Sequence, residues 1–268
     1  MRFPDIDPIA FQIGPVAVRW YGLAYLAGIL LGWAYAKRLA RTQRIWGDRP
    51  APITPADIDD LLIWVTLGVV LGGRLGYAIF YQPGHFLDDP LGFFRLWQGG
   101  MSFHGGMLGT TLALVLFALR RRIPVLSLLD VAAAATPFGL FFGRIANFIN
   151  GELWGRPSDV PWAMVFPGAG PEPRHPSQLY EAALEGAALF LALRFLTHSL
   201  RSLGRPGLTC AAFIGLYGLF RTIVEFFREP DPQLGFITGF FTMGMLLSIP
   251  MVIVGAATAA WAIARARR

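Results

Sequence analysis

The feature that most constrains this chain is its series of long, unbroken apolar runs, such as LAYLAGILLGWAYA and MLLSIPMVIVGAATAAWAIA. A helix needs about 20 mostly apolar residues to cross roughly 30 Å of hydrocarbon. Because lipid offers no water, a spanning segment must satisfy its backbone N–H and C=O groups within a helix or a closed barrel. Barrel strands are shorter and alternate in hydropathy, unlike these runs. The sequence therefore predicts an all-α polytopic membrane protein.

Composition supports this prediction, because only 15% of the 268 residues are charged and 54% are hydrophobic. Soluble domains carry about 25% charged residues. We expect a bundle of about seven transmembrane helices that forms one catalytic domain over residues 1–268. The expected spans are 16–36, 58–81, 101–119, 126–150, 176–198, 207–227 and 235–263. Segment 151–175 is rich in Pro and Gly and too polar to span, so we expect a small extracytoplasmic cap there.

The distribution of lysine and arginine predicts the orientation. Loops that face the cytoplasm carry an excess of these residues. One side of the predicted bundle has Lys37, Arg38, Arg41, Arg44, Arg49, Arg120, Arg121, Arg122, Arg201, Arg205, Arg265, Arg267 and Arg268. The other side has Arg2, Arg19, Arg95, Arg156, Arg174 and Arg228. We therefore place the N-terminus outside and the C-terminus in the cytoplasm, and this bias explains the net charge of +6 without a nucleic-acid partner.

Several polar side chains lie inside the predicted spans. A charge at the bilayer centre costs about 2.5–3.5 kcal/mol on insertion scales, so such residues face a partner or a wet cavity. Helical spacing puts residues three or four apart on one face. This groups Arg144 with Asn147, and Tyr217 with Arg221 and Glu225. One interpretation is purely structural, with Arg74 paired to Glu181 or Glu185.

Arg144 and Arg221 favour a binding role because both lie near the outer end of a span, within reach of lipid head groups. Arginine stays charged and presents a planar fork of donors to phosphate oxygens. His104, in SFHGGMLG, stands at the outer end of the third span, and histidine is the commonest proton carrier at neutral pH. The alternative there is a helix-packing seam made by Gly105 and Gly109.

Other features have plainer interpretations. The glycine pairs with small-xxx-small spacing are expected to pack helices; they are Gly28 with Gly32, Gly68 with Gly72, and Gly139 with Gly143. Tyr21 lies in RWYGLAYLAG, where an interfacial aromatic belt is the default interpretation. Cys210 is isolated inside an apolar span, which indicates a buried thiol. Because the sequence has no metal-ligand cluster and no phosphate-binding loop, we expect no cofactor.

The segment GRIANFINGELWG, residues 143–155, ends the fourth span with unusual polarity. At every defined position it resembles the signature Gly-Arg-x-(Gly/Ala)-Asn-Phe-(apolar)-Asn-x-Glu-x-x-Gly of the prolipoprotein diacylglyceryl transferases. Other segments are similar to that family in the same order along the chain: VRWYGLAYLAG, GGRLGY, SFHGGMLG, PRHPSQLYEA and YGLFRTIVEFFREPD.

The resemblance implies a bacterial inner-membrane enzyme that moves the diacylglyceryl group of phosphatidylglycerol onto the lipobox cysteine thiol of a preprolipoprotein. A thioether forms and glycerol phosphate leaves. The nucleophile then belongs to the substrate, which fits the isolation of Cys210. Carried over residue by residue, the family roles make Arg144 and Arg221 the phosphate-facing pair and His104 the candidate base. The supporting site would be Tyr21, Asn147, Glu152, Gly155, Tyr217 and Glu225.

Two other classes stay open on the residues alone. A transporter also lines its path with intramembrane Arg and Glu, although this sequence has no visible inverted repeat. A lipid-binding scaffold without chemistry would need the same arginines. Transfer activity on phosphatidylglycerol separates the three.

Overall fold

The computed structural model describes residues 1–4, 6–84, 89–96, 99–230, 235–237 and 239–266. Its backbone divides into two compact units. Unit 1 comprises Met1–Pro50 and Asp130–Arg268, and unit 2 comprises Ala51–Leu129.

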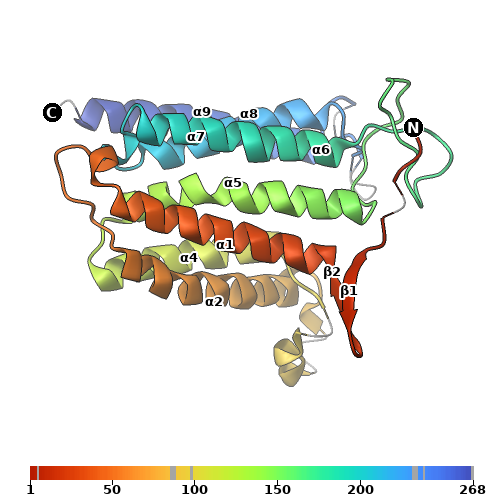
Figure 1. Ribbon diagram of the computed structural model, residues 1–268, viewed down its shortest axis with the longest axis horizontal. Coiled ribbons are helices and arrows are strands. Elements are labelled where there is room, and N and C mark those ends of the chain that lie inside the picture. The colour runs from red at the N-terminus through yellow and green to blue at the C-terminus, as the bar shows by residue number, and fades with distance from the viewer. Residues whose placement is uncertain (5, 85–88, 97–98, 231–234, 238, 267–268) are drawn as a thin grey trace. The chain divides into compact units, whose positions relative to one another are not determined.

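Unit 1 consists mainly of helices that run side by side (Figure 1). Its elements are β1 (Ile9–Ile13), β2 (Val16–Arg19), α1 (Trp20–Arg41), η1 (Gln43–Trp46), most of α5 (Val125–Ile149), α6 (Ser177–Glu181), the π-helix η4 (Ala182–Ala188), α7 (Leu189–His198), η5 (Ser202–Gly204), α8 (Leu208–Glu225) and α9 (Met243–Ala266). The N-terminus, the β1–β2 hairpin and segment 151–175 lie at one end of these helices, and α9 ends at the other.

Two predicted spans begin too early. Residues 16–19 form β2, which pairs antiparallel with β1 through Ile13 and Val16, so the first helix starts at Trp20. Gly14, at a φ of 57°, makes the tight turn between the strands, and the alternating β-branched residues on either side favour a strand. The last helix starts at Met243, because Gly235 and Gly239 take positive φ values that a helix cannot hold.

Unit 2 is a pair of antiparallel helices, α2 (Pro55–Phe80) and α4 (Phe103–Arg121), with the 3-10 helix η2 (Pro90–Phe94) between them and the start of α5 after them. Thr54 caps α2 by accepting from the backbone N–H of Asp57 at 3.2 Å. The helices touch along glycines: a Cβ on Gly72 would lie 2.7 Å from the Gly109 Cα. The predicted packing roles of Gly72 and Gly109 are therefore confirmed.

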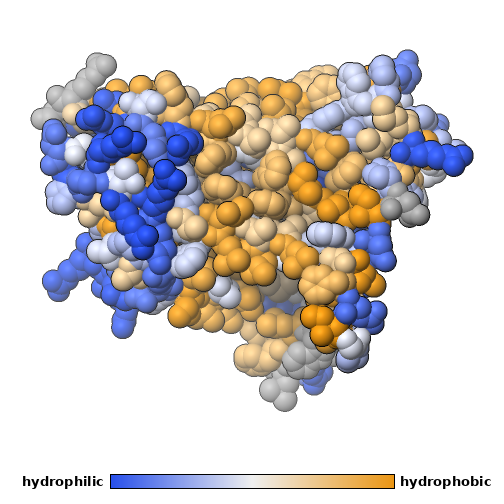
Figure 2. All heavy atoms as spheres, in the orientation of Figure 1, coloured by the Kyte–Doolittle hydropathy of each residue, from blue (hydrophilic) through white to orange (hydrophobic). Residues whose placement is uncertain are grey.

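The helices have the surface of a membrane protein. Of the described helices, five are long and apolar enough to cross a bilayer: α2, α4, α5, α8 and α9. On α2, a stripe of exposed apolar side chains recurs every four residues at Ile63, Leu67, Leu71 and Leu75. Figure 2 shows hydrophobic residues along the middle of the helices and hydrophilic residues toward their ends. The predicted fold class, a polytopic helical membrane protein, is confirmed.

Two helical segments of unit 1 are not among the five helices that are long and apolar enough to cross a bilayer. One is α1, whose last turns carry Lys37, Arg38 and Arg41. The other is the continuous run α6–η4–α7, which matches the predicted span 176–198 but is interrupted by the seven-residue π-helix. A π-helix inside an α-helix is rare and is found frequently at functional sites. Here it carries Glu185.

A buried carboxylate joins α5 to the start of α8. Asp130 has no exposed surface and accepts from the backbone N–H groups of Gly207 and Cys210, both at 2.7 Å. The first N–H groups of a helix have no partner within that helix and favour a negative charge. Asp130 therefore fixes α8, and with it the charged residues at the far end of α8, against α5.

Candidate active site

Two arginines from different helices meet at one carboxylate oxygen. Arg144 on α5 places its Nε 2.6 Å from Oε2 of Glu181, and Arg221 on α8 places Nη1 3.2 Å from the same oxygen. Glu181 lies on α6 and is completely buried. The side chains of Arg144 and Arg221 keep 21% and 12% of their surface exposed. Two guanidinium groups thus lie side by side while part of each stays accessible.

The second guanidinium is also held by its own helix. Nη2 of Arg221 lies 2.5 Å from Oε1 of Glu225, four residues on, and Oε2 of Glu225 accepts from the hydroxyl of Thr242 at 2.6 Å. Arg228 joins more loosely, with Nη1 3.5 Å from Glu225 and Nε 3.9 Å from Glu181. The predicted face of Arg221 and Glu225 is therefore an ion pair, and Thr242 beside α9 is a partner that the sequence did not reveal.

A third carboxylate completes the cluster. Glu185 on η4 is completely buried, with Oε2 3.5 Å from Nη2 of Arg144 and Oε1 3.6 Å from Nη1 of Arg221. The purely structural interpretation paired Glu181 or Glu185 with Arg74. The glutamates pair with Arg144 and Arg221, whereas Arg74 in unit 2 donates to backbone carbonyl oxygens around η2, including Phe93 at 2.9 Å and Gly92 at 2.6 Å.

The signature segment, residues 143–155, turns sharply after the end of α5, and its last residues lie beside the cluster of arginines and glutamates. Asn147, which is 8% exposed, donates from Nδ2 to Oε1 of Glu152 at 2.7 Å. Gln178 on α6 in turn donates to the backbone carbonyl of Glu152 at 2.6 Å. Asn150 also donates to Oε1 of Glu152, at 3.5 Å, so the carboxylate that was expected in the supporting site accepts from two asparagines of the signature. Asn147 lies about one turn after Arg144 on α5, so Asn147 and Glu152 lie beside the two guanidinium groups.

Gly155 has a structural reason to be glycine. A Cβ there would lie 2.5 Å from the Phe227 carbonyl oxygen and 2.7 Å from the Cβ of His175. Its backbone N–H donates to the His175 carbonyl at 2.9 Å. The neighbouring Arg156 donates to the carbonyls of Arg228 and Glu225, both at 2.9 Å. The end of the signature is thus clamped onto the end of α8.

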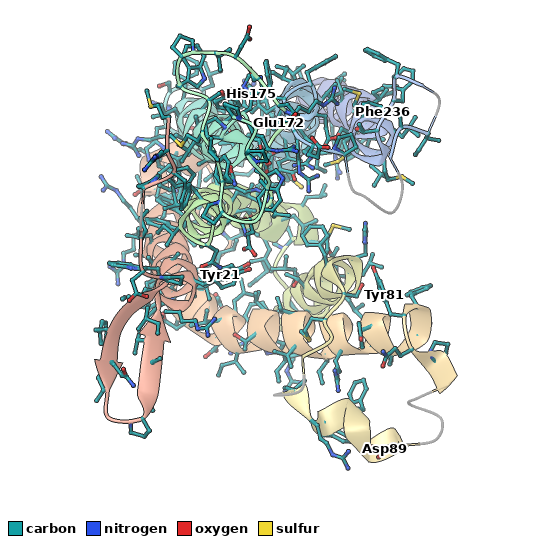
Figure 3. All side chains as sticks on the ribbon, turned by 90° about the vertical axis from the view of Figure 1, so that its right-hand side faces the viewer. Tyr21, Tyr81, Asp89, Glu172, His175 and Phe236 are labelled. Atoms are coloured by element: carbon teal, nitrogen blue, oxygen red, sulfur yellow. The ribbon has the colours of Figure 1, made fainter. Side chains whose placement is uncertain are left out.

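Two tyrosines lie close to the charged cluster. Tyr217, one turn before Arg221 on α8, is close enough to Glu185 and Arg144 to interact with their charges. Tyr21, at the start of α1, interacts in the same way with Glu152 and Arg144, and its hydroxyl lies 3.2 Å from that of Tyr25. Tyr21 lies in the first turn of α1, directly after β2, which lies at the same end of unit 1 as segment 151–175 (Figure 1), and Figure 3 looks onto that end with Tyr21, Glu172 and His175 labelled.

Segment 151–175 packs around aromatic side chains. Phe166 is 2% exposed, and its ring centroid lies 5.1 Å from that of Phe3. At the end of the segment, Nδ1 of His175 lies 3.0 Å from the hydroxyl of Tyr180, which accepts from the indole of Trp162 at 2.6 Å. Burial lowers the pKa of His175 from its ordinary value of 6.5.

The predicted base lies in the other unit. His104 is exposed in the first turn of α4, in unit 2, with its ring 5.6 Å from that of Phe103. Ser102 caps this helix by accepting from the Gly105 N–H at 3.2 Å. The arginine pair lies in unit 1, so the role of His104 stays a prediction.

One predicted packing pair is wrong in part. Gly28 on α1 packs against the Gly139 backbone, where a Cβ would lie 3.1 Å from the Gly139 Cα. A Cβ added to Gly139 or to Gly143 would itself meet nothing within 4 Å among the described residues. In the described part of the chain, helix packing therefore does not require a glycine at position 143, one residue before Arg144.

The fold and this cluster define a class: a polytopic membrane protein that holds accessible guanidinium groups among buried carboxylates at one end of its helices. The chain matches the model of the prolipoprotein diacylglyceryl transferase family over residues 8–261 and belongs to that family. The family expected from the signature is therefore confirmed.

Proteins named phosphatidylglycerol–prolipoprotein diacylglyceryl transferase are similar to this chain over nearly all of its length. One from Rhizobium leguminosarum bv. trifolii is 58% identical, covering 100% of this chain and 94% of that protein. One from Rhodopseudomonas palustris is 60% identical, covering 95% of this chain and 89% of that protein. One from Nitrobacter winogradskyi is 58% identical, covering 97% and 90%.

Proposed function

We propose that this chain transfers the diacylglyceryl group of phosphatidylglycerol to the lipobox cysteine thiol of preprolipoproteins. A thioether forms and glycerol phosphate is released. The names of the relatives give phosphatidylglycerol, prolipoproteins as the acceptor class and the diacylglyceryl group as the group transferred. The observation that carries the proposal at the level of the site is the meeting of Arg144 and Arg221 at one oxygen of Glu181, within the membrane-spanning helices.

The arginine pair suits the charge that develops in this reaction. Attack by sulfur breaks the carbon–oxygen bond at the glycerol carbon that bears the phosphate, so negative charge grows on the departing phosphate. Guanidinium groups aimed at that phosphate stabilise the transition state more than the ground state. Glu181 and Glu225 hold the two groups in place before the lipid arrives, at 2.6 Å and 2.5 Å from Arg144 and Arg221.

The acceptor thiol needs a base. A cysteine thiol has a reference pKa of about 8.5, and only the thiolate attacks well. His104 is the candidate base in this proposal, with Tyr21, Asn147, Glu152, Gly155 and Tyr217 as the supporting site. Replacing His104 by Gln should lower turnover at neutral pH. Wild-type turnover by His104→Gln across the pH range would remove the histidine from the mechanism.

The proposed orientation puts the N-terminus outside, the C-terminus in the cytoplasm and the active site toward the outer leaflet of the bacterial inner membrane. It is supported by the basic residues that close α1, η5 and α9, including Arg41, Arg205 and Arg265. Arg267 and Arg268 lie outside the described residues. Segment 151–175 is then an extracytoplasmic cap.

The direct test mixes purified protein, phosphatidylglycerol and a lipobox peptide in a detergent that preserves the fold. We expect the peptide to gain the mass of one diacylglyceryl group and glycerol phosphate to appear in equal amount. Lipid binding with no mass gain would favour a scaffold, and passage of a solute across proteoliposomes with no mass gain would favour a transporter.

A further inference from the structure

The three buried carboxylates of the arginine cluster are held very differently. Glu181 has an ion pair at 2.6 Å and accepts a hydrogen bond at 3.2 Å, and Glu225 has an ion pair at 2.5 Å and accepts a hydrogen bond at 2.6 Å, so each has one oxygen that accepts. Glu185 has cations only at 3.5 Å and 3.6 Å. Among the described residues, neither of its oxygens has a hydrogen-bond partner, although the side chain is completely buried. An ionised carboxylate in that state is costly, because burial removes water without supplying donors.

The position of Glu185 suggests a role for a buried carboxylate that has no hydrogen-bond donor in the described part of the chain. It faces both guanidinium groups at once, through Nη2 of Arg144 and Nη1 of Arg221. Within the described parts of the chain, the other charged or titratable groups that interact with it are Glu181 on α6 and Tyr217 on α8. A phosphodiester that binds both arginines must compete with a carboxylate that already faces them. Of the three glutamates, Glu185 lies farthest from the arginine nitrogens, so it is the easiest to displace.

We propose that Glu185 is a counter-anion that the phosphodiester of the substrate lipid replaces, and that the displaced carboxylate takes up one proton. This inference rests on the proposed function, because it assumes that phosphatidylglycerol binds at the arginine pair. Once the guanidinium groups turn to the phosphate, a buried Glu185 has lost its counter-charges, and neutralisation by a proton removes the cost of burying it. When glycerol phosphate leaves, the carboxylate regains the arginines and returns the proton.

Two consequences follow from charge and mass balance. Binding that takes up one proton weakens as pH rises, by up to about tenfold in Kd per pH unit. Removing the resident charge with Glu185→Gln should abolish this dependence and tighten binding at alkaline pH. The same substitution at Glu181 should have the opposite effect on affinity, because Glu181 positions both arginines.

The experiment is calorimetric titration of the detergent-purified full chain with phosphatidylglycerol in buffers of different ionisation enthalpy, which counts the protons taken up. We expect about one proton for wild type, none for Glu185→Gln, and wild-type uptake for Glu229→Gln, whose carboxylate pairs with Arg174 instead. Far-UV circular dichroism and thermal unfolding check that each variant is folded.

Zero proton uptake by wild type would overturn the inference even if Glu185→Gln failed to fold. Wild-type uptake by folded Glu185→Gln, or weaker lipid binding by that variant, would overturn it as well. Transfer to the lipobox peptide is measured on the same preparations. Absence of transfer by wild type counts against the proposed function, whereas transfer with an unchanged proton count in Glu185→Gln counts against the role of Glu185 alone.

Discussion

At the scale of single residues, the account depends on arginine chemistry rather than on positive charge alone. Arg144 and Arg221 share one oxygen of Glu181 and keep part of their surface exposed. A planar guanidinium can donate to Glu181 and to a phosphate at the same time, because its five N–H groups point in fixed directions. Lysine is a point charge on a flexible stem and cannot make both contacts in this geometry.

We therefore expect Arg144→Lys and Arg221→Lys each to lower kcat/KM for lipid transfer by about 100-fold or more, although the charge is kept. The measurement is the rate of mass gain of the lipobox peptide. Arg265→Lys is the matched control, because Arg265 stacks on Trp261 near the end of α9 and should keep its rate. A lysine variant of the pair that retained near-normal rates would show that bidentate donation is unnecessary.

Gly155 gives a second prediction at this scale. A Cβ added at Gly155 would overlap the Phe227 carbonyl and His175. Gly155→Ala should therefore push the end of the signature segment away from the end of α8. We expect a loss of about 1–3 kcal/mol in stability, seen as a lower midpoint of thermal unfolding. Gly143→Ala, with open space at its Cβ, should not lower that midpoint. Equal midpoints for the two variants would contradict the packing of Gly155.

At the scale of elements, the cluster of arginines and glutamates forms because contacts between helices fix how each helix is rotated about its axis and where it lies along that axis. The carboxylate of Asp130 on α5 caps α8 through Gly207 and Cys210, so it sets how far α8 extends toward the arginine pair. The π-helix η4 turns Glu185 toward the same pair as Glu181, which lies just before it on α6.

Asp130→Asn should destabilise unit 1 by about 1–3 kcal/mol, because one amide oxygen cannot replace both carboxylate acceptors and the amide N–H₂ faces a backbone donor. The check is thermal unfolding of the purified protein. Asp60→Asn provides the control, since Asp60 is half-exposed in its ion pair with Arg121 and such pairs contribute little. If Asp130→Asn unfolded at the wild-type temperature, the capping of α8 would not be structural.

Most elements of this fold can be predicted from the sequence, whereas the pairing of charges between helices cannot. The long apolar runs predicted α2, α4, α5 and α8, with ends correct to within a few residues. They could do so because a helix that crosses a bilayer must be both long and hydrophobic. Those same helices are apolar on nearly every side, so the pattern says little about which face meets which neighbour. For that reason the sequence did not predict that Glu181 and Glu185 form ion pairs with both Arg144 and Arg221.

At the scale of the whole molecule, the chain is a multi-pass membrane protein whose orientation remains a proposal. The proposed topology can be tested with single cysteines in a chain whose native Cys210 is replaced by Ser. Asp159→Cys, in segment 151–175, should react with a membrane-impermeant maleimide on intact spheroplasts, and Arg205→Cys should react only after lysis; both positions are exposed. The reverse pattern would invert the topology and place the arginine pair on the cytoplasmic side.

The central claim is that guanidinium groups from two membrane-embedded helices bind one anionic lipid head group. The most direct measurement is an experimental structure of the protein with phosphatidylglycerol bound. The account predicts phosphate oxygens at about 2.7–2.9 Å from N–H groups of both Arg144 and Arg221, with Glu181 still in contact with both. A head group bound away from the pair, or held by only one of the two arginines, would contradict it.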